Sequence, residues 1–246
     1  MWPLIVGNWK MHGLGLQLEQ IGALAALLQA APPRAGVIIC PPATLIHRMA
    51  GVARGHIAVG GQNCHHENAG AFTGDLSAEM LKDAGASAVI VGHSERRKHH
   101  GETDGMVADK ARAASRAGLT AIICIGETLV QRQAGTALTV CGAQIAESVP
   151  DGMSATTCAI GYEPLWAIGS GQVPGAAQIA EMHAHIRRCL VSRLGANGDA
   201  VRILYGGSVK PDNAPAILAL PQVGGALVGG ASLDAIEFEA IVRAVP

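Results

Sequence analysis

Short apolar runs of strand length recur along the whole chain, and this periodicity restricts the fold more than any other feature of the sequence. Most of the runs are apolar at successive positions rather than at alternate ones, which is typical of parallel strands covered on both faces. The eight predicted strands are Leu4–Trp9, Val37–Cys40, Ile57–Gly61, Ala88–Gly92, Thr120–Ile125, Thr157–Tyr162, Arg202–Tyr205 and Ala226–Gly229.

Segments with helical periodicity separate these strands. The clearest predicted helices are Leu14–Ala30, Asp104–Ala117, Leu129–Glu147 and Ala176–Leu194. Residues that favour helix N-termini support this assignment, because Thr103 or Asp104 begins one helix and Asp234 precedes a last one near the C-terminus.

Eight strands that alternate with helices in 246 residues, without a linker, predict an α/β fold of one domain over residues 1–246. A doubly wound open sheet is the structural alternative. Eight βα units in a chain of this length favour a closed (β/α)8 barrel instead.

Composition excludes several classes of function. The chain has a formal net charge of −1 and only 3% aromatic residues, so it lacks the basic patch and the stacking platforms of nucleic-acid-binding proteins. The longest uncharged stretch, Asn213–Leu233, is interrupted by prolines and Gly-Gly pairs, which argues against a membrane span. The N-terminus reads as a first strand rather than a signal peptide. We therefore expect no nucleic-acid partner and no membrane insertion.

The six cysteines indicate a reducing compartment. None forms a C-x-x-C pair and several lie inside apolar runs, so we expect free thiols in a cytoplasmic protein. Cys124 has no adjoining cation and is expected to pack rather than to act as a nucleophile. The ten histidines match no metal-binding pattern, and no nucleotide-binding glycine motif is present. The sequence therefore predicts neither a metal nor a cofactor.

Polar side chains collect at the carboxyl ends of the predicted strands, where a barrel of this kind has its active site. The first strand leads into G-N-W-K, the fourth into G-H-S-E-R-R and the sixth into G-Y-E-P-L-W. The candidate side chains in these segments are Asn8, Lys10, His93, Ser94, Glu95 and Glu163. The seventh and eighth strands lead into Y-G-G-S-V and V-G-G-A-S-L, and glycine N–H groups ahead of helices are good phosphate ligands.

Each of these residues also has an ordinary structural explanation when it is taken alone. A single lysine such as Lys10 is most often a solvated surface residue. His93 fits a buried, hydrogen-bonded histidine, and Glu163 fits a solvent-facing carboxylate near a helix start. The two glycine-rich segments fit ordinary turns.

Taken together, five segments resemble the triosephosphate isomerase family, in the same order from one end of the chain to the other. They are Gly7–Met11, Val91–Arg97, Gly161–Gly171, Tyr205–Val209 and Val228–Leu233. The segment G-Y-E-P-L-W-A-I-G-S-G is the most specific of them. The resemblance implies a TIM barrel that interconverts D-glyceraldehyde 3-phosphate and dihydroxyacetone phosphate through an enediol(ate), in glycolysis and gluconeogenesis, without a cofactor.

The resemblance also implies the roles of four residues. Glu163 is expected to be the base that moves a proton between two carbons, and neutral His93 to polarise the carbonyl group, as in the family's known chemistry. Asn8 supplies another donor, and Lys10 places a positive charge beside the enediolate and the phosphate.

Further positions match family residues that support the catalytic residues or bind the phosphate group. Glu95 is similar to a family residue near the lysine and is expected to hold Lys10 in place, with Ser94 and Cys124 as supporting residues. The expected phosphate-binding residues are Gly169, Ser208, Gly229 and Gly230. The segment Pro164–Gly171 resembles a mobile lid that keeps water from the intermediate.

The connection Asn63–Ser77 is longer than a usual βα loop and carries Phe72 where an exposed residue is expected. It resembles the protruding loop through which subunits of the family's homodimer contact each other. Gln172 and Pro174 depart from the usual family pattern, which concerns lid kinetics rather than chemistry.

Two other functions remain open at this stage. One is isomerisation of a related short sugar phosphate, such as a tetrose phosphate, with the same base and phosphate site. The other is a non-catalytic barrel that only binds a phosphorylated metabolite, although Glu163, His93 and Lys10 are all present.

Overall fold

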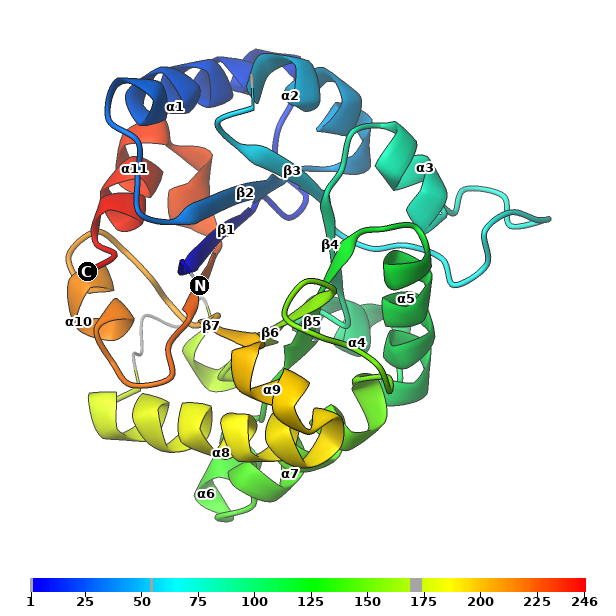
Figure 1. The fold of residues 1–246 in the computed structure, drawn as a ribbon, viewed down its shortest axis with the longest axis vertical. Coiled ribbons are helices and arrows are strands. Elements are labelled where there is room, and N and C mark those ends of the chain that lie inside the picture. Colours follow the sequence, from blue (N-terminus) through cyan, green and yellow to red (C-terminus); the bar gives the residue numbers. More distant parts are fainter. Residues whose placement is uncertain (1, 54, 169–173) are drawn as a thin grey trace.

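Eight parallel strands pair in chain order and close into a barrel, with β8 hydrogen-bonded to β1 (Figure 1). The computed structural model describes residues 2–53, 55–168 and 174–246. The strands are β1 (Leu4–Asn8), β2 (Gly36–Cys40), β3 (Ala58–Gly61), β4 (Ala88–Val91), β5 (Thr120–Ile125), β6 (Cys158–Tyr162), β7 (Arg202–Tyr205) and β8 (Gly225–Val228). This confirms the closed (β/α)8 barrel predicted from the sequence.

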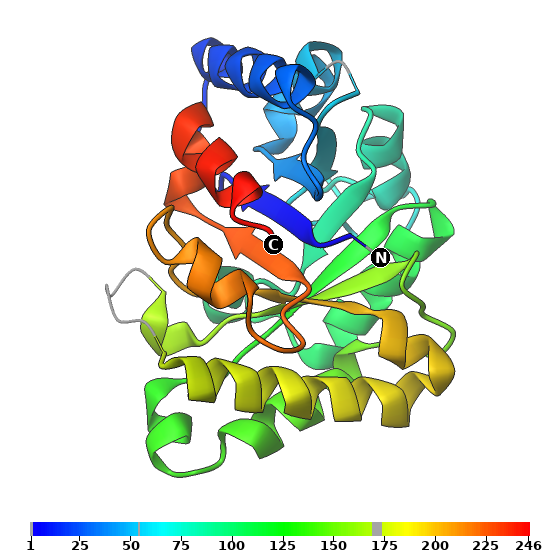
Figure 2. The ribbon, with the colours of Figure 1, turned by 60° about the vertical axis from the view of Figure 1, so that its left-hand side comes forward.

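Helices form a layer around the barrel, as Figures 1 and 2 show from two directions. They are α1 (Leu18–Ala30), α2 (Ile46–Ala53), α3 (Ala78–Asp83), α4 (Ser94–His100), α5 (Asp104–Arg116), α6 (Leu129–Gln133), α7 (Ala137–Ser148), α8 (Ala176–Leu194), α9 (Ala196–Ala200), α10 (Ala214–Leu218) and α11 (Ala235–Arg243). Among the described residues, no helix has the length and apolar character needed to cross a membrane.

The continuous apolar runs are explained by two separate cores. In β1, Leu4 and Val6 belong to a cluster inside the barrel, whereas Ile5 belongs to the larger cluster between the strands and the helices. Because neighbouring side chains of a strand point to opposite faces, a strand covered on both faces needs apolar residues at every position. The carboxyl ends, where these runs stop, are then free to carry polar groups.

The predicted helix Leu129–Glu147 is wrong as a single helix, because the structure divides it into α6 and α7. Gly135 lies between them with φ 71°, a left-handed conformation that ends a helix and favours glycine. A smaller difference concerns α1, whose α-helical part begins at Leu18 after a 3₁₀ turn at Gly15–Gln17. The cap at the start of α5 is Thr103, whose hydroxyl accepts a hydrogen bond from the Met106 N–H group.

The connection between β3 and α3 extends away from the barrel, as the cyan segment of Figure 1 shows. A single bridge between His65 and Ser77 closes its base. Within the connection, Phe72 packs against the ring of His65, with 4.1 Å between the ring centroids, and remains 42% exposed. This lobe therefore presents apolar surface to the solvent.

Candidate active site

A cavity of about 450 Å³ opens at the carboxyl ends of the strands. Seven of the residues predicted from the sequence line it, and they come from β1, β4, β6, β7 and β8 or from the turns that follow these strands. They are Asn8, Lys10, His93, Glu163, Ser208, Gly229 and Gly230. Residues separated by more than 200 positions are thus brought into one site by the closure of the barrel.

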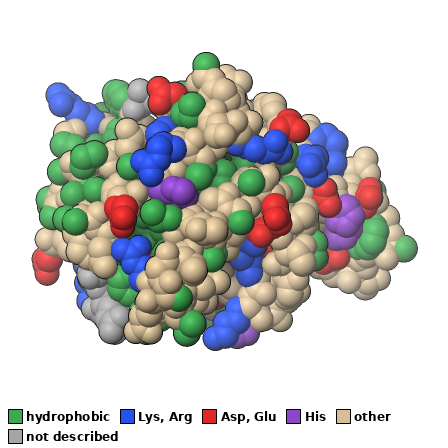
Figure 3. Space-filling model, turned by 90° about the horizontal axis from the view of Figure 1, so that it is seen from below, with side chains coloured by type: hydrophobic (Ala, Val, Ile, Leu, Met, Phe, Trp, Pro, Cys, Tyr) green, Lys and Arg blue, Asp and Glu red, His purple; other side chains and the backbone are tan. Residues whose placement is uncertain are grey.

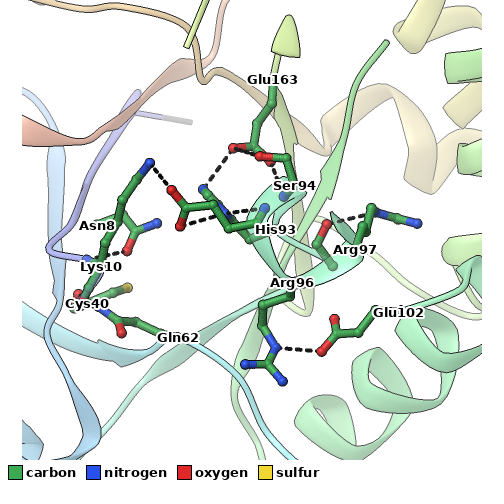
Figure 4. A network of polar contacts seen from close by, with 12 residues as sticks. Asn8, Lys10, Cys40, Gln62, His93, Ser94, Arg96, Arg97, Glu102 and Glu163 are labelled. Carbon is green, nitrogen blue, oxygen red and sulfur yellow. Dashed lines mark hydrogen bonds and ion pairs between the residues drawn. The ribbon is translucent and has the colours of Figure 1, made fainter. Parts of the chain in front are cut away.

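Glu163 directly follows β6 and is 2% exposed. Its main-chain N–H group donates to the Ile125 carbonyl oxygen at 2.8 Å, which continues the strand pairing by one residue. Its carboxylate accepts hydrogen bonds from the main-chain N–H group of Ser94 at 3.0 Å and from the Ser94 hydroxyl at 3.3 Å (Figure 4). A buried carboxylate is thereby held at the edge of the cavity by three kinds of contact, the third being with His93 at 2.8 Å.

His93 is turned toward the cavity by Gly92, which has φ 67° and whose missing Cβ would lie 2.7 Å from a Val107 methyl group. His93 then occupies the N-cap position of α4, where its Nδ1 accepts a hydrogen bond from the Glu95 N–H group at 3.3 Å. Because an N–H group can only donate, Nδ1 carries a lone pair and the ring proton is on Nε2. This Nε2 lies 2.8 Å from Glu163 Oε1. The imidazole is therefore arranged as a neutral donor.

Lys10 has φ 52°, which is strained for a residue with a side chain. Two hydrogen bonds hold the backbone in this state: Lys10 N–H donates to Asn8 Oδ1 at 3.0 Å, and Gln62 Nε2 donates to the Lys10 carbonyl at 2.8 Å. Asn8 is 5% exposed, and with its oxygen engaged, its NH2 group is the donor it can offer to a ligand. The last residue of β1 thus presents an amide donor to the cavity, and the turn after β1 presents a cation.

Glu95, in the first turn of α4, pairs with Lys10 at 2.6 Å between Oε1 and Nζ. Partial burial raises the pKa of Glu95, but the hydrogen bond from Lys10 and the charges near it outweigh this and hold the pKa below its usual range. Glu95 is therefore charged at neutral pH and restrains the ammonium group of Lys10.

The opposite end of the cavity is built from backbone. Gly229 precedes a 3₁₀ turn at Gly230–Leu233, and the first N–H groups of such a turn have no partner within it. Trp9 Nε1 donates to the Ser232 carbonyl at 2.9 Å and fixes this turn against β1. Ser208 follows β7, and Lys210 adds a second cation to the lining. This end suits an anion.

Three predicted residues do not line this cavity. Ser94 and Glu95 instead contact residues that line the cavity, Glu163 and Lys10 respectively. Cys124 belongs to the cluster inside the barrel, and burial, together with the negative charge of Glu163, raises the pKa of its thiol well above the usual value. Gly169 lies outside the described residues, as do the other residues at the end of the predicted lid, 170 and 171.

The described start of the lid segment is a 3₁₀ turn at Leu165–Ala167. Within it, Trp166 Nε1 donates to Glu127 Oε1 at 3.0 Å, and the Tyr162 hydroxyl donates to the same oxygen at 3.2 Å. Glu127 is fully buried. The beginning of the segment is thus tied to the turn after β5.

Besides Lys210, sequence reasoning missed two residues that support this site, Gln62 and Glu127. Both follow the carboxyl end of a strand directly or after one residue, β3 and β5 respectively. Lys10 and Glu163 were selected because polar residues at the carboxyl ends of the strands are candidates for the site. Gln62 and Glu127 satisfy the same criterion. Within the described residues, no group of three His, Cys, Asp or Glu side chains is placed to hold a metal ion.

Comparisons with known proteins agree with this geometry. A family model described as triosephosphate isomerase matches residues 3–245. A triosephosphate isomerase from Ruegeria pomeroyi is 58% identical over 244 residues, covering 98% of this chain and 96% of that protein. One from Caulobacter vibrioides is 55% identical, covering 99% and 96%. The crystal structure of triosephosphate isomerase from Bartonella henselae is similar with a TM-score of 0.93 and 47% identity, covering 99% of both chains.

Proposed function

Since the chain belongs to the triosephosphate isomerase family and is an aldose–ketose isomerase of triose phosphates, we propose how its side chains divide the reaction. The observation that carries the proposal is the meeting of Glu163, His93 and Lys10 in one cavity. Proton transfer at the carbon next to a carbonyl group requires a proton acceptor, a neutral hydrogen-bond donor and a cation close together.

Glu163 acts as the base. Its carboxylate takes a proton from the carbon beside the carbonyl group, the electron pair moves to the carbonyl oxygen, and an enediolate forms. The carboxylic acid then returns the proton to the neighbouring carbon, which converts ketose to aldose or the reverse. Burial of Glu163 supports this role, because a carboxylate shielded from water is a more effective base toward a bound substrate.

His93 acts as the donor to the oxygens. Its single Nε2 proton is directed at Glu163 in the structure, and a bound carbonyl oxygen must take over this hydrogen bond before the reaction begins. Because Nδ1 is engaged by the Glu95 N–H group, Nε2 gives its proton to one oxygen and then takes a proton back from the other, so the ring moves a proton between them without forming a cation.

Lys10 and Asn8 stabilise the charge that develops. The enediolate and the phosphate are both negative, and Lys10, restrained by Glu95, lies at the edge of the same cavity. The Asn8 amide offers a further hydrogen bond to an enediolate oxygen. A fixed charge that needs no rearrangement during the reaction lowers the barrier most.

The phosphate group lies at the backbone end of the cavity, against Ser208 and the turn at Gly229 and Gly230. N–H groups at the start of a helical turn bind phosphate well. By the family resemblance Gly169 adds another donor when the segment that contains it closes over the substrate. This arrangement recognises the phosphate and places the carbon chain between Glu163 and His93.

The protein functions as a homodimer in the cytoplasm. The lobe at the right-hand end of Figure 3 carries apolar, acidic and histidine side chains, and Phe72 is exposed on it. Met11 and Leu14, on the connection after β1, are 94% and 76% exposed. Apolar surface of this kind is stable in water when a second copy covers it. The six cysteines are unpaired, which suits a reducing compartment.

A coupled spectrophotometric assay tests the substrate. We expect reversible conversion of glyceraldehyde 3-phosphate and dihydroxyacetone phosphate in the presence of EDTA, and much slower turnover of a tetrose phosphate. Faster turnover of the tetrose phosphate contradicts the assignment of the carbon chain length, and binding without turnover of either compound contradicts the assigned chemistry.

A further inference from the structure

A glutamine on α7 clamps the turn that follows β5. The Gln144 side-chain oxygen accepts a hydrogen bond from the Gly126 N–H group at 2.8 Å, and its Nε2 donates to the Gly126 carbonyl at 3.2 Å. Only one orientation of the amide satisfies both bonds. One side chain therefore engages both polar backbone groups of Gly126.

Gly126 in turn contacts the main chain of Glu163. A Cβ atom at Gly126 would lie 1.8 Å from the Glu163 carbonyl oxygen and 2.6 Å from a Leu165 methyl group. The two neighbours of Gly126 also hold this segment, because Glu163 N–H donates to Ile125 at 2.8 Å and Leu165 N–H donates to Glu127 at 3.0 Å. Gly126 is thus the middle of the three residues on which the main chain around Glu163 rests.

We propose that Gln144 is a positioning residue for the catalytic base. Gln144 holds the Gly126 peptide in place. This peptide in turn supports the Glu163 main chain and so sets the position of the Glu163 carboxylate relative to His93. The proposal rests on Glu163 being the base. Gln144 does not line the cavity that binds substrate and acts only through the backbone.

The expected effect separates catalysis from binding. Ser208, Gly229 and Gly230, which are expected to bind the phosphate, lie after β7 and β8, whereas Gln144 acts on the turn after β5. A base displaced by about 1 Å loses about 100-fold in rate. Without the Gln144 hydrogen bonds, the bonds of Ile125 and Glu127 still hold the Glu163 main chain, so the Glu163 carboxylate should be displaced only in part. We expect kcat to fall about tenfold and KM to stay within about twofold of the parent value.

The variant Gln144→Met removes both hydrogen bonds and keeps the length of the side chain. Gln144→Glu removes only the donor and serves as a second variant if the first does not fold. The matched control is Gln131→Met. Gln131 accepts a hydrogen bond from the Thr128 N–H group at 2.8 Å, a similar contact two residues beyond Gly126. We expect lower kcat in the Gln144 variants and unchanged kcat in the control.

Amide hydrogen exchange supplies a readout that does not depend on activity. The exchange of the Glu163 N–H group should accelerate in Gln144→Met and stay unchanged in Gln131→Met. Unchanged kcat in both Gln144 variants, a change in KM alone, or an equal loss in the control overturns the proposal. If Glu163→Gln proved fully active, the proposed base would be wrong, whereas the exchange result would still report whether Gln144 holds the Glu163 main chain.

Discussion

Replacing the buried histidine of α8 should remove part of the acid sensitivity of the fold. The ring of His183 is fully buried, and its Nδ1 contacts the Gln222 carbonyl oxygen at 3.2 Å. The ring also packs edge-on against Tyr162, with 5.8 Å between the centroids. Burial lowers the pKa of His183 to about 4 from its ordinary value of 6.5; the bond to Gln222 opposes this, and the charge of Arg187 adds to it.

The direction of the pH effect follows from where the proton binds. Well above pH 6.5 the imidazole is neutral in both the native and the unfolded state and contributes no pH dependence. Below it, the unfolded chain gains a proton that the native state takes up only near pH 4, so the free energy of unfolding falls between these values. The loss amounts to about 2 kcal/mol at pH 5 and about 3 kcal/mol at lower pH.

The assay is denaturant unfolding at pH 7.5 and pH 5.0. Both measurements use one protein concentration, because association into the proposed homodimer would add to the apparent stability. The variant His183→Asn retains a side-chain hydrogen-bond donor, the asparagine NH2 group, and removes the titrating imidazole. The difference between the two pH values should be about 2 kcal/mol smaller in this variant than in the parent protein. His47→Asn, at an exposed histidine of α2, is the control and should keep the parent difference. An unchanged difference in His183→Asn would refute the reasoning.

Two further predictions concern the site and the dimer. Lys10→Met should lower kcat/KM about 10²–10³-fold without unfolding the protein, because the enediolate and the phosphate lose a fixed positive charge; near-parent activity in the coupled assay would remove Lys10 from the mechanism. Sedimentation of the parent protein should give a mass near twice 25.1 kDa, and Phe72→Asp should shift it toward 25.1 kDa, because a carboxylate is costly to bury in an interface. A parent protein that sediments as a monomer at micromolar concentration would contradict the dimer.

The strands were predictable to within about one residue at each end because both of their faces are buried. A strand with a core on either side shows an unbroken apolar run, and the run stops where the polar site begins. The break between α6 and α7 was not predictable in the same way, since the helical periodicity of the sequence continues on both sides of Gly135. A single glycine costs a helix only about 1 kcal/mol, so its presence alone does not decide whether the helix ends there.

The polar residues of the cavity were predictable because they follow strands and resemble a known family. The residues that hold them were not. Gln62 binds the Lys10 carbonyl from 52 positions away, and Gln144 binds Gly126 from 18 positions away, on a helix. A glutamine on a helix or beside a strand forms no motif, and its partner is set by how the helices pack on the barrel. Such contacts become visible only in three dimensions.

The central claim is that Glu163 moves the proton, and the turnover of Glu163→Gln tests it most directly. The amide keeps the size of the side chain but is not basic, so the barrel should retain its melting temperature. In the coupled assay with glyceraldehyde 3-phosphate and dihydroxyacetone phosphate, kcat should fall about 10²–10⁴-fold, as expected for loss of a general base. A folded Glu163→Gln variant with near-parent kcat would contradict the account.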